Sequence, residues 1–159
     1  MKLYIKQKVF SWGDKFTVKD AAGEDRYFVE GEVFSLGKKL HVYNRNGQEV
    51  AFIQQKLLTW MPRYSVVMGG SEVAQVVQKF TFFRPRYTIE GLGWEVDGDF
   101  FAHDYQVHQA GRTIAAISKE WMTWGDSYEL DIADSANEVM ALAVVLTIDA
   151  VIESAQNNN

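Results

Sequence analysis

The chain has 159 residues, a formal net charge of −5 and no cysteine, and 47% of its residues are apolar. This composition excludes a disordered chain, a disulfide framework, thiolate metal sites and a cysteine nucleophile. The acidic balance also argues against nucleic-acid binding, because neutralising phosphates requires a concentrated basic surface. The lack of cysteine, and of an apolar leader in Met1–Phe10, predicts a protein of the reducing cytoplasm.

Residues 6–68 form a series of strand-like runs that are separated by turn residues. Gly13–Asp14 and Asn46–Gly47 are typical of tight hairpin turns, because glycine and asparagine tolerate positive φ angles. Met61–Pro62 ends a longer run in the same way. The strands predicted in this half are Lys6–Trp12, Lys15–Asp20, Arg26–Leu36, Lys38–Arg45, Gln48–Trp60 and Arg63–Met68.

Residues 71–134 repeat this series. Trp60 and Tyr64, for example, recur as Trp124 and Tyr128, 64 residues later. The sequence therefore predicts about twelve strands in two six-stranded repeats, about 1–70 and 71–134. The strands predicted in the second half are Glu72–Phe83, Arg86–Gly91, Leu92–His103, Tyr105–Gln109, Arg112–Trp124 and Ser127–Asp134.

The final stretch predicts a buried helix at about residues 135–153. In Val139–Ile152 only Thr147 and Asp149 are polar, and a helix that is apolar on all sides must be buried on all sides. Ser135 and Glu138 have the spacing of a capping box at its start. One or two further strands are the alternative, but the run has no turn residue and is long for a strand.

The combination of twelve strands and one buried helix predicts a closed antiparallel β-barrel around that helix. Such a barrel has a radius of roughly 12 Å, wide enough for a helix with its side chains. A propeller would leave no place for the apolar run. We expect a single domain at residues 1–154 and a polar tail at 155–159. The apolar run is shorter than the ~20 residues of a membrane span, so we do not expect an integral membrane protein.

Several of these features resemble the LURP-one-related family over essentially the whole chain. They are the two six-stranded copies, Gln7–Lys8, the turns Trp12–Gly13–Asp14 and Trp124–Gly125–Asp126, Arg84–Pro85–Arg86–Tyr87, and the terminal run Val139–Ile152. The resemblance implies the tubby C-terminal-like fold, shared with phospholipid scramblases, in which twelve strands surround a C-terminal helix. It also implies relatives that act on or at membrane lipids.

A set of basic residues is the best candidate site: Arg63, Arg84, Arg86, Lys56 and Lys79 recur at matching positions of the repeated phrases. Arginine forks suit phosphate oxygens, and the aromatic neighbours Trp60, Phe83 and Tyr87 could enter a lipid headgroup layer. The sequence thus predicts binding of an anionic membrane lipid at this basic patch. The alternative is that these side chains cap the barrel ends and pair with acidic residues.

Other chemistry has weaker support in the sequence. The carboxylate pairs Glu30–x–Glu32 and Asp97–x–Asp99 suit a hydrolase, or a polar outer face beside a glycine bulge. The spacing of the histidines, at 41, 103 and 108, does not match a metal-ligand set. We therefore expect no catalytic residue, metal or cofactor. The expected function is a non-enzymatic binding or scaffold module for an anionic lipid headgroup or a protein partner. The alternative is an enzyme with its site at a barrel mouth.

Overall fold

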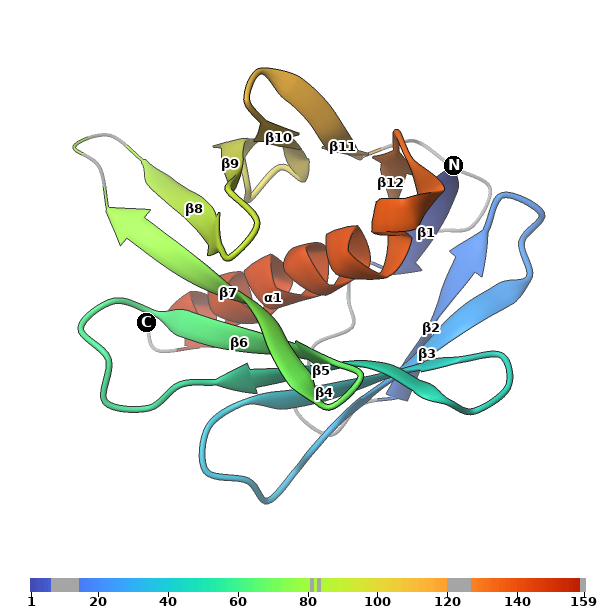
Figure 1. Ribbon diagram of the computed structural model, residues 1–159, viewed down its shortest axis with the longest axis horizontal. Coiled ribbons are helices and arrows are strands. Elements are labelled where there is room, and N and C mark those ends of the chain that lie inside the picture. The colour runs from blue at the N-terminus through green and yellow to red at the C-terminus, as the bar shows by residue number, and fades with distance from the viewer. Residues whose placement is uncertain (7–14, 81, 83, 120–126, 158–159) are drawn as a thin grey trace.

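A computed structural model of the chain shows a closed barrel with one helix along its interior (Figure 1). The structure describes residues 1–6, 15–80, 82, 84–119 and 127–157. The strands are β1 (Lys2–Lys6), β2 (Lys15–Asp20), β3 (Asp25–Gly31), β4 (Lys39–Asn44), β5 (Glu49–Gln55), β6 (Arg63–Met68), β7 (Ser71–Phe80), β8 (Pro85–Glu90), β9 (Trp94–Asp99), β10 (Asp104–Gln109), β11 (Arg112–Ser118) and β12 (Ser127–Ile132). A 3-10 turn, Ser135–Asn137, leads into helix α1 (Glu138–Asn157).

Each strand pairs antiparallel with its neighbours in sequence, and β1 closes the barrel against β12. The predicted fold class, a twelve-stranded antiparallel barrel around a C-terminal helix, is therefore confirmed. The position of the first strand differs from the prediction. The observed β1 is Lys2–Lys6, whereas the predicted run Lys6–Trp12 and its turn at Gly13–Asp14 lie, after Lys6, outside the described residues.

The core is formed where the inward face of the barrel meets α1. In β10, Tyr105 and Val107 point inward and are buried, while Asp104 and Gln106 are exposed, as strand alternation requires. Every side chain of α1 from Ala141 to Ile148 is fully buried. The buried Thr147 hydroxyl donates a hydrogen bond to the Ala143 carbonyl at 2.7 Å. The helical region, residues 135–156, is long and apolar enough to cross a membrane, but most of it is buried inside the barrel.

The start of α1 differs from the predicted capping box. Asp134, not Ser135, is the N-cap, and its carboxylate accepts from the Ala136 backbone N–H at 2.9 Å. The Glu138 side chain does not fold back onto the turn. It binds Arg26 and Tyr27 on β3 instead, because a buried carboxylate needs donors that the short turn does not supply. At its other end the helix continues to Asn157, beyond the expected end near residue 153.

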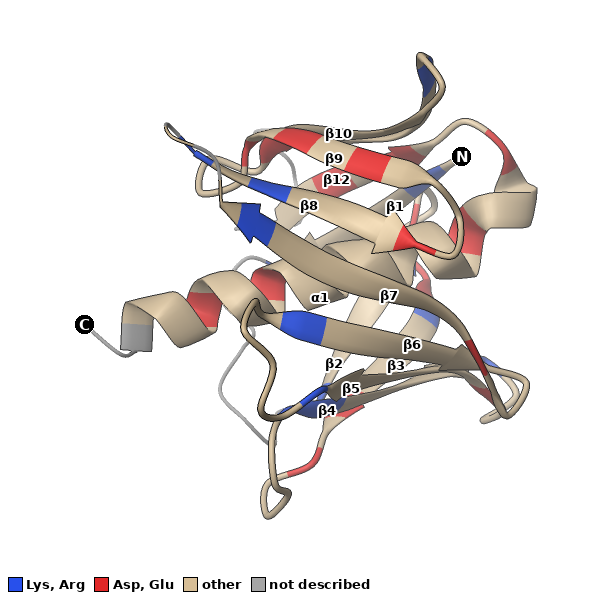
Figure 2. Ribbon diagram, turned by 60° about the vertical axis from the view of Figure 1, so that its left-hand side comes forward, with Lys and Arg blue, Asp and Glu red and all other residues tan. Residues whose placement is uncertain are grey.

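The two ends of the barrel have different chemistry. We call the end that holds the β3–β4, β5–β6, β7–β8 and β9–β10 connections the loop end, and the opposite end the turn end. The C-terminus of α1 emerges at the loop end, on the left of Figures 1 and 2. The turn end has tight turns such as Asn46–Gly47 and Gly69–Gly70, whose glycines have positive φ angles of 75°, 60° and 79°.

Several predicted strands are too long at the loop end. β3 ends at Gly31, not at Leu36, and β5 ends at Gln55, not at Trp60. Likewise β9 ends at Asp99, four residues before the predicted end at His103. The residues beyond these strands are apolar and contain few turn residues, so they resemble strand sequence. In the structure they leave the hydrogen-bonded ladder and form loops, whose large apolar side chains are exposed apart from the buried Phe100.

Gly98 allows β9 and β10 to approach closely. A Cβ atom at this position would lie 2.5 Å from the Cα atom of Tyr105 and from the backbone oxygen of Asp104. The pairing around Gly98 and around Gly31 shows no register shift, so the glycine bulge considered from the sequence is wrong at both positions. The shifts lie elsewhere, for example between Val107 and His108.

Candidate functional site

Two of the five predicted basic residues lie side by side on the outer wall. Lys79 on β7 and Arg86 on β8 are direct partners in the strand register, and both are exposed. Neither forms an ion pair with any residue that the structure describes. Like charges that face each other across two strands repel unless water or an anion separates them. Lys79 is the last residue but one of β7 and Arg86 is the second residue of β8, so both lie at the loop end of the barrel wall.

A cavity of about 240 Å³ lies beside this pair and contains charges of both signs. Lys79, Arg86, Thr88, Glu95 and Asp97 are among its lining residues. The Asp97 carboxylate accepts a hydrogen bond from the Nε2 atom of His108 at 3.0 Å. The two carboxylates reduce the positive potential of the cavity, so an anion is best placed at the outer rim, between the two cations.

Arg63 and Lys56 are committed to acidic partners. The Arg63 guanidinium lies 2.6 Å from a carboxylate oxygen of Glu90 and also bonds to Gln75. The Lys56 ammonium lies 3.4 Å from Glu72. The structure therefore separates the predicted patch into a pair without acidic partners, Lys79 and Arg86, and two cations whose charge is balanced. Arg84 is exposed in the β7–β8 connection, close in sequence to the first pair.

The aromatic neighbours named with this patch have different positions. Trp60 is 97% exposed in the β5–β6 loop. Tyr87 points into the core and is 2% exposed, so its predicted role at a headgroup layer is wrong. Burial also raises the pKa of Tyr87, with smaller contributions from Tyr64 and Asp149. Phe83 lies outside the described residues.

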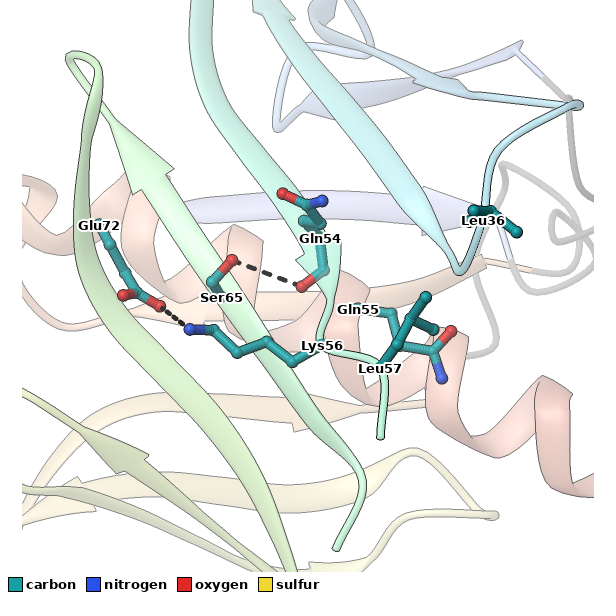
Figure 3. A pocket seen from close by; sticks show the side chains of 7 residues that line it. All are labelled: Leu36, Gln54, Gln55, Lys56, Leu57, Ser65 and Glu72. Atoms are coloured by element: carbon teal, nitrogen blue, oxygen red, sulfur yellow. Dashed lines mark hydrogen bonds and ion pairs between the residues drawn. The ribbon is translucent and has the colours of Figure 1, made fainter. Parts of the chain in front are cut away.

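A larger depression of about 530 Å³ lies on the outer wall beside Lys56 (Figure 3). The Lys56 side chain extends across β6 to Glu72, and Ser65 lies next to its stem. The Ser65 hydroxyl donates to the Gln54 carbonyl at 3.5 Å. Because the Lys56–Glu72 pair neutralises itself here, this depression offers an anion no net charge. Its lining residues are Leu36, Gln54, Gln55, Lys56, Leu57, Ser65 and Glu72.

Lys38, at the loop end, was not identified from the sequence. Its ammonium donates to the Ala150 carbonyl of α1 at 3.1 Å. Burial lowers the pKa of Lys38 to about 8, and the charge of Glu153 partly opposes this shift. The contact fixes the C-terminal half of α1 to the β3–β4 loop. A pair of residues 112 positions apart leaves no local sequence signal.

The carboxylate pairs considered from the sequence are divided among separate contacts. Glu30 lies 3.3 Å from Lys15, and Glu32 lies 2.7 Å from the Nε2 atom of His41. Asp97 contacts His108, while Asp99 accepts from the Ala102 backbone N–H at 3.0 Å. Among the described residues, no three His, Asp or Glu side chains are placed to hold a metal ion.

The loop end carries a set of exposed apolar side chains, all of which lie in segments predicted to be strands. Apart from Met1 and Phe28, it holds all the exposed large apolar side chains of the described residues. We call this set the loop-end apolar set: Val33, Phe34 and Leu36 (β3–β4), Leu57, Leu58 and Trp60 (β5–β6), Phe80 and Phe82 (β7–β8) and Phe101 (β9–β10). Large apolar side chains that are exposed together at one end of the barrel make this end a candidate interaction surface.

Comparison with known proteins gives a family and a fold. The family model described as LURP-one-related matches residues 1–149. The uncharacterized Bacillus subtilis protein YxjI is 35% identical over 152 residues, which cover 96% of this chain and 94% of that protein.

A solved structure of a protein from Arabidopsis thaliana has the same fold. It superposes with a TM-score of 0.65 over 94% of this chain and 90% of its own, at 16% sequence identity. At this identity the likeness concerns the fold alone.

Proposed function

The chain belongs to the LURP-one-related family, and we propose that it is a non-enzymatic binding module that attaches to anionic lipid headgroups at a membrane surface. The observation that carries this proposal is the Lys79–Arg86 pair. These two cations face each other across β7 and β8 without an acidic partner among the described residues. An anionic phosphate between them would relieve their repulsion and would accept hydrogen bonds from both side chains.

The location of the pair also favours a planar, charged partner. It lies at the loop end of the β7–β8 hairpin, and Arg84 is in the connection between these two strands. Juxtamembrane cations contribute about 1 kcal/mol each to the attraction of anionic membranes. The formal net charge of −5 opposes this attraction, so we expect weak binding that salt readily suppresses.

The interior of the barrel favours binding over catalysis. The helix side chains Ala141–Ile148 occupy the interior and are fully buried. A ligand site is therefore to be sought on the outer wall or at the rim. There, His41 bonds to both Glu32 and Glu49 and His108 contacts Asp97, so these groups bond to one another. General acid–base catalysis requires groups that converge on one substrate atom.

Vesicle co-sedimentation tests the proposal. We expect the protein to bind phosphatidylcholine vesicles that contain phosphatidylserine or a phosphoinositide, and to dissociate as salt rises from about 50 to about 300 mM. Replacing both Lys79→Gln and Arg86→Gln should weaken binding about thirtyfold, from the loss of about 2 kcal/mol.

A matched variant, Lys56→Gln with Arg63→Gln, removes the same charge from two cations that already have acidic partners. It should weaken binding far less. Equal losses in the two variants would show that only net charge matters, and binding unchanged by Lys79→Gln with Arg86→Gln would overturn the proposal. Thermal unfolding of each variant verifies that it is folded.

A further inference from the structure

The loop-end apolar set is exposed to an unusual degree. Phe34, Leu58 and Phe82 are fully exposed, and Trp60 is 97% exposed. Such values mean that these side chains pack neither on the barrel nor on one another. They come from three separate loops rather than from one folded patch. The transfer of an exposed apolar side chain from water to an apolar phase lowers the free energy.

The backbone holds one of these side chains outward at a conformational cost. Leu58 has a φ angle of 58°, in the left-handed region that non-glycine residues rarely adopt. Internal packing does not compensate for this conformation, because the side chain is fully exposed. Strained residues of this kind cluster at functional positions. An external partner that takes up the leucine side chain would account for both observations.

The cations beside these side chains identify the partner. On the β7–β8 hairpin, Phe80 and Phe82 lie between Lys79 and Arg84 in the sequence. Aromatic side chains and long cationic ones together are typical of the interfacial layer of a bilayer, where the rings enter the acyl boundary and the charges remain among the headgroups. A folded protein partner would instead favour a contiguous, close-packed apolar patch.

We infer that the loop end of the barrel inserts into the interfacial layer of an anionic lipid bilayer, with the C-terminal end of α1 facing the membrane. The inference rests on the proposed headgroup binding and extends it, because the cations supply the salt-sensitive part of the attraction and the apolar loops supply a salt-resistant part. The turn end, with polar turns such as Asn46–Gly47, then faces away from the bilayer (Figure 1).

The chain contains no cysteine, so a single introduced thiol can report its own environment. Leu58→Cys and Phe82→Cys would each be labelled with a polarity-sensitive fluorophore, and Asn46→Cys at the turn end would be the control. Phosphatidylcholine vesicles with phosphatidylserine should shift the emission to the blue at positions 58 and 82 but not at 46. Brominated acyl chains should quench only the two loop-end labels.

A second variant measures the apolar contribution itself. Leu58→Ser with Trp60→Ser should lower vesicle partitioning about tenfold at about 50 mM salt, where the wild type binds. If the labels at 58 and 82 remain in an aqueous environment while Lys79→Gln with Arg86→Gln still weakens binding, the inference is overturned and headgroup binding stands. Failure to bind any vesicle would overturn both. If the blue shift depends on protein concentration and not on vesicles, the loop end binds a second copy of the chain instead of a bilayer, and the inference is overturned.

Discussion

The hydroxyl of Tyr128 on β12 donates a hydrogen bond to the carboxylate of Asp149 on α1, inside the barrel. Asp149 is 8% exposed, and the Nε2 atom of His103 lies 3.4 Å from its other oxygen. The His103 and Tyr128 rings stack with centroids 4.3 Å apart. Burial, followed by the charge of Asp149, raises the pKa of Tyr128. These contacts help to fix the rotation of α1, whose fully buried segment Ala141–Ile148 is apolar except for Thr147.

Tyr128→Phe should destabilise the protein by about 1–3 kcal/mol, because it leaves a buried carboxylate without a hydrogen-bond donor. Tyr105→Phe is a matched control. Tyr105 is equally buried on β10, and its hydroxyl has no hydrogen-bond partner among the described residues. Its removal should be neutral or stabilising. Urea denaturation measures both differences, and equal losses of stability would contradict the proposed role of Asp149.

The other end of α1 provides a second test. Glu138 is buried and accepts hydrogen bonds from Arg26, at 3.0 Å to Nη2, and from the Tyr27 hydroxyl at 2.7 Å. Arg26→Gln should cost about 2 kcal/mol, since hydrogen bonds to charged groups contribute about 1.5–3 kcal/mol. The double variant Arg26→Gln with Glu138→Gln should recover part of this loss, because it also removes the buried charge.

The control for that variant is Arg45→Gln. Arg45 also pairs with two carboxylates, those of Asp20 and Glu24, but on the surface of the turn end. Its loss should cost less than about 1 kcal/mol. If both arginine variants lower the free energy of unfolding equally, or if the double variant is no more stable than Arg26→Gln alone, the Glu138 contact is not the anchor that its burial suggests.

A histidine on the outer wall predicts a pH dependence. Both ring nitrogens of His41 lie 2.7 Å from carboxylate oxygens, Nδ1 from Glu49 and Nε2 from Glu32. Ionised carboxylates only accept hydrogen bonds, so both contacts are satisfied only when the imidazole carries two protons. Burial opposes this charge, but the two hydrogen bonds outweigh it and raise the pKa of His41.

Glu30, which faces His41 in the strand register, adds negative charge, while Lys39, 3.9 Å from Glu32, reduces it. A raised folded-state pKa gives stability that is complete below the ordinary histidine pKa of about 6.5 and is lost as pH rises through the raised value. The free energy of unfolding should therefore fall by about 1 kcal/mol at most over this range.

Urea denaturation of the wild type and of His41→Gln between pH 5.5 and 8.5, roughly the range over which histidine titrates, measures this difference. The His41→Gln variant should be less stable than the wild type at acidic pH. At the alkaline end the difference between their free energies of unfolding should be small. Glu49→Gln should show a smaller slope than the wild type, because one hydrogen bond remains. A stability difference between wild type and His41→Gln that is independent of pH would exclude a charged His41.

The sequence predicts the barrel well because each half repeats one hairpin pattern and the last run is apolar on all sides. Its errors concentrate at the loop end, where Phe34, Leu58 and Trp60 were assigned to strands. A prediction from hydrophobic periodicity treats apolar residues without turn signals as buried, but here they are exposed. The disagreement between local pattern and structure thus marks the surface that we assign to the membrane, as expected where function overrides foldability.

The basic patch could be predicted only as a set of candidates. Repeated spacing places Arg63 and Arg86 in equivalent positions, yet Arg63 pairs with Glu90, 27 residues away in sequence. Which cation meets an acid depends on strand register across the barrel wall, and one residue of slip reverses every side chain. The sequence does not encode that register locally, so the distinction between Lys79–Arg86 and the balanced cations needed the structure.

The closure of the barrel sets when the protein can fold. Tyr4 on β1 bonds to Glu129 on β12, 125 residues further along the chain, and α1 follows both. All twelve strands are therefore synthesised before the helix that fills their interior. β1 cannot pair with β12 until β12 has been synthesised. Contacts of such long sequence separation slow folding. We expect the nascent chain to present unpaired strand edges until α1 has been synthesised, so chaperone binding would be concentrated in that interval.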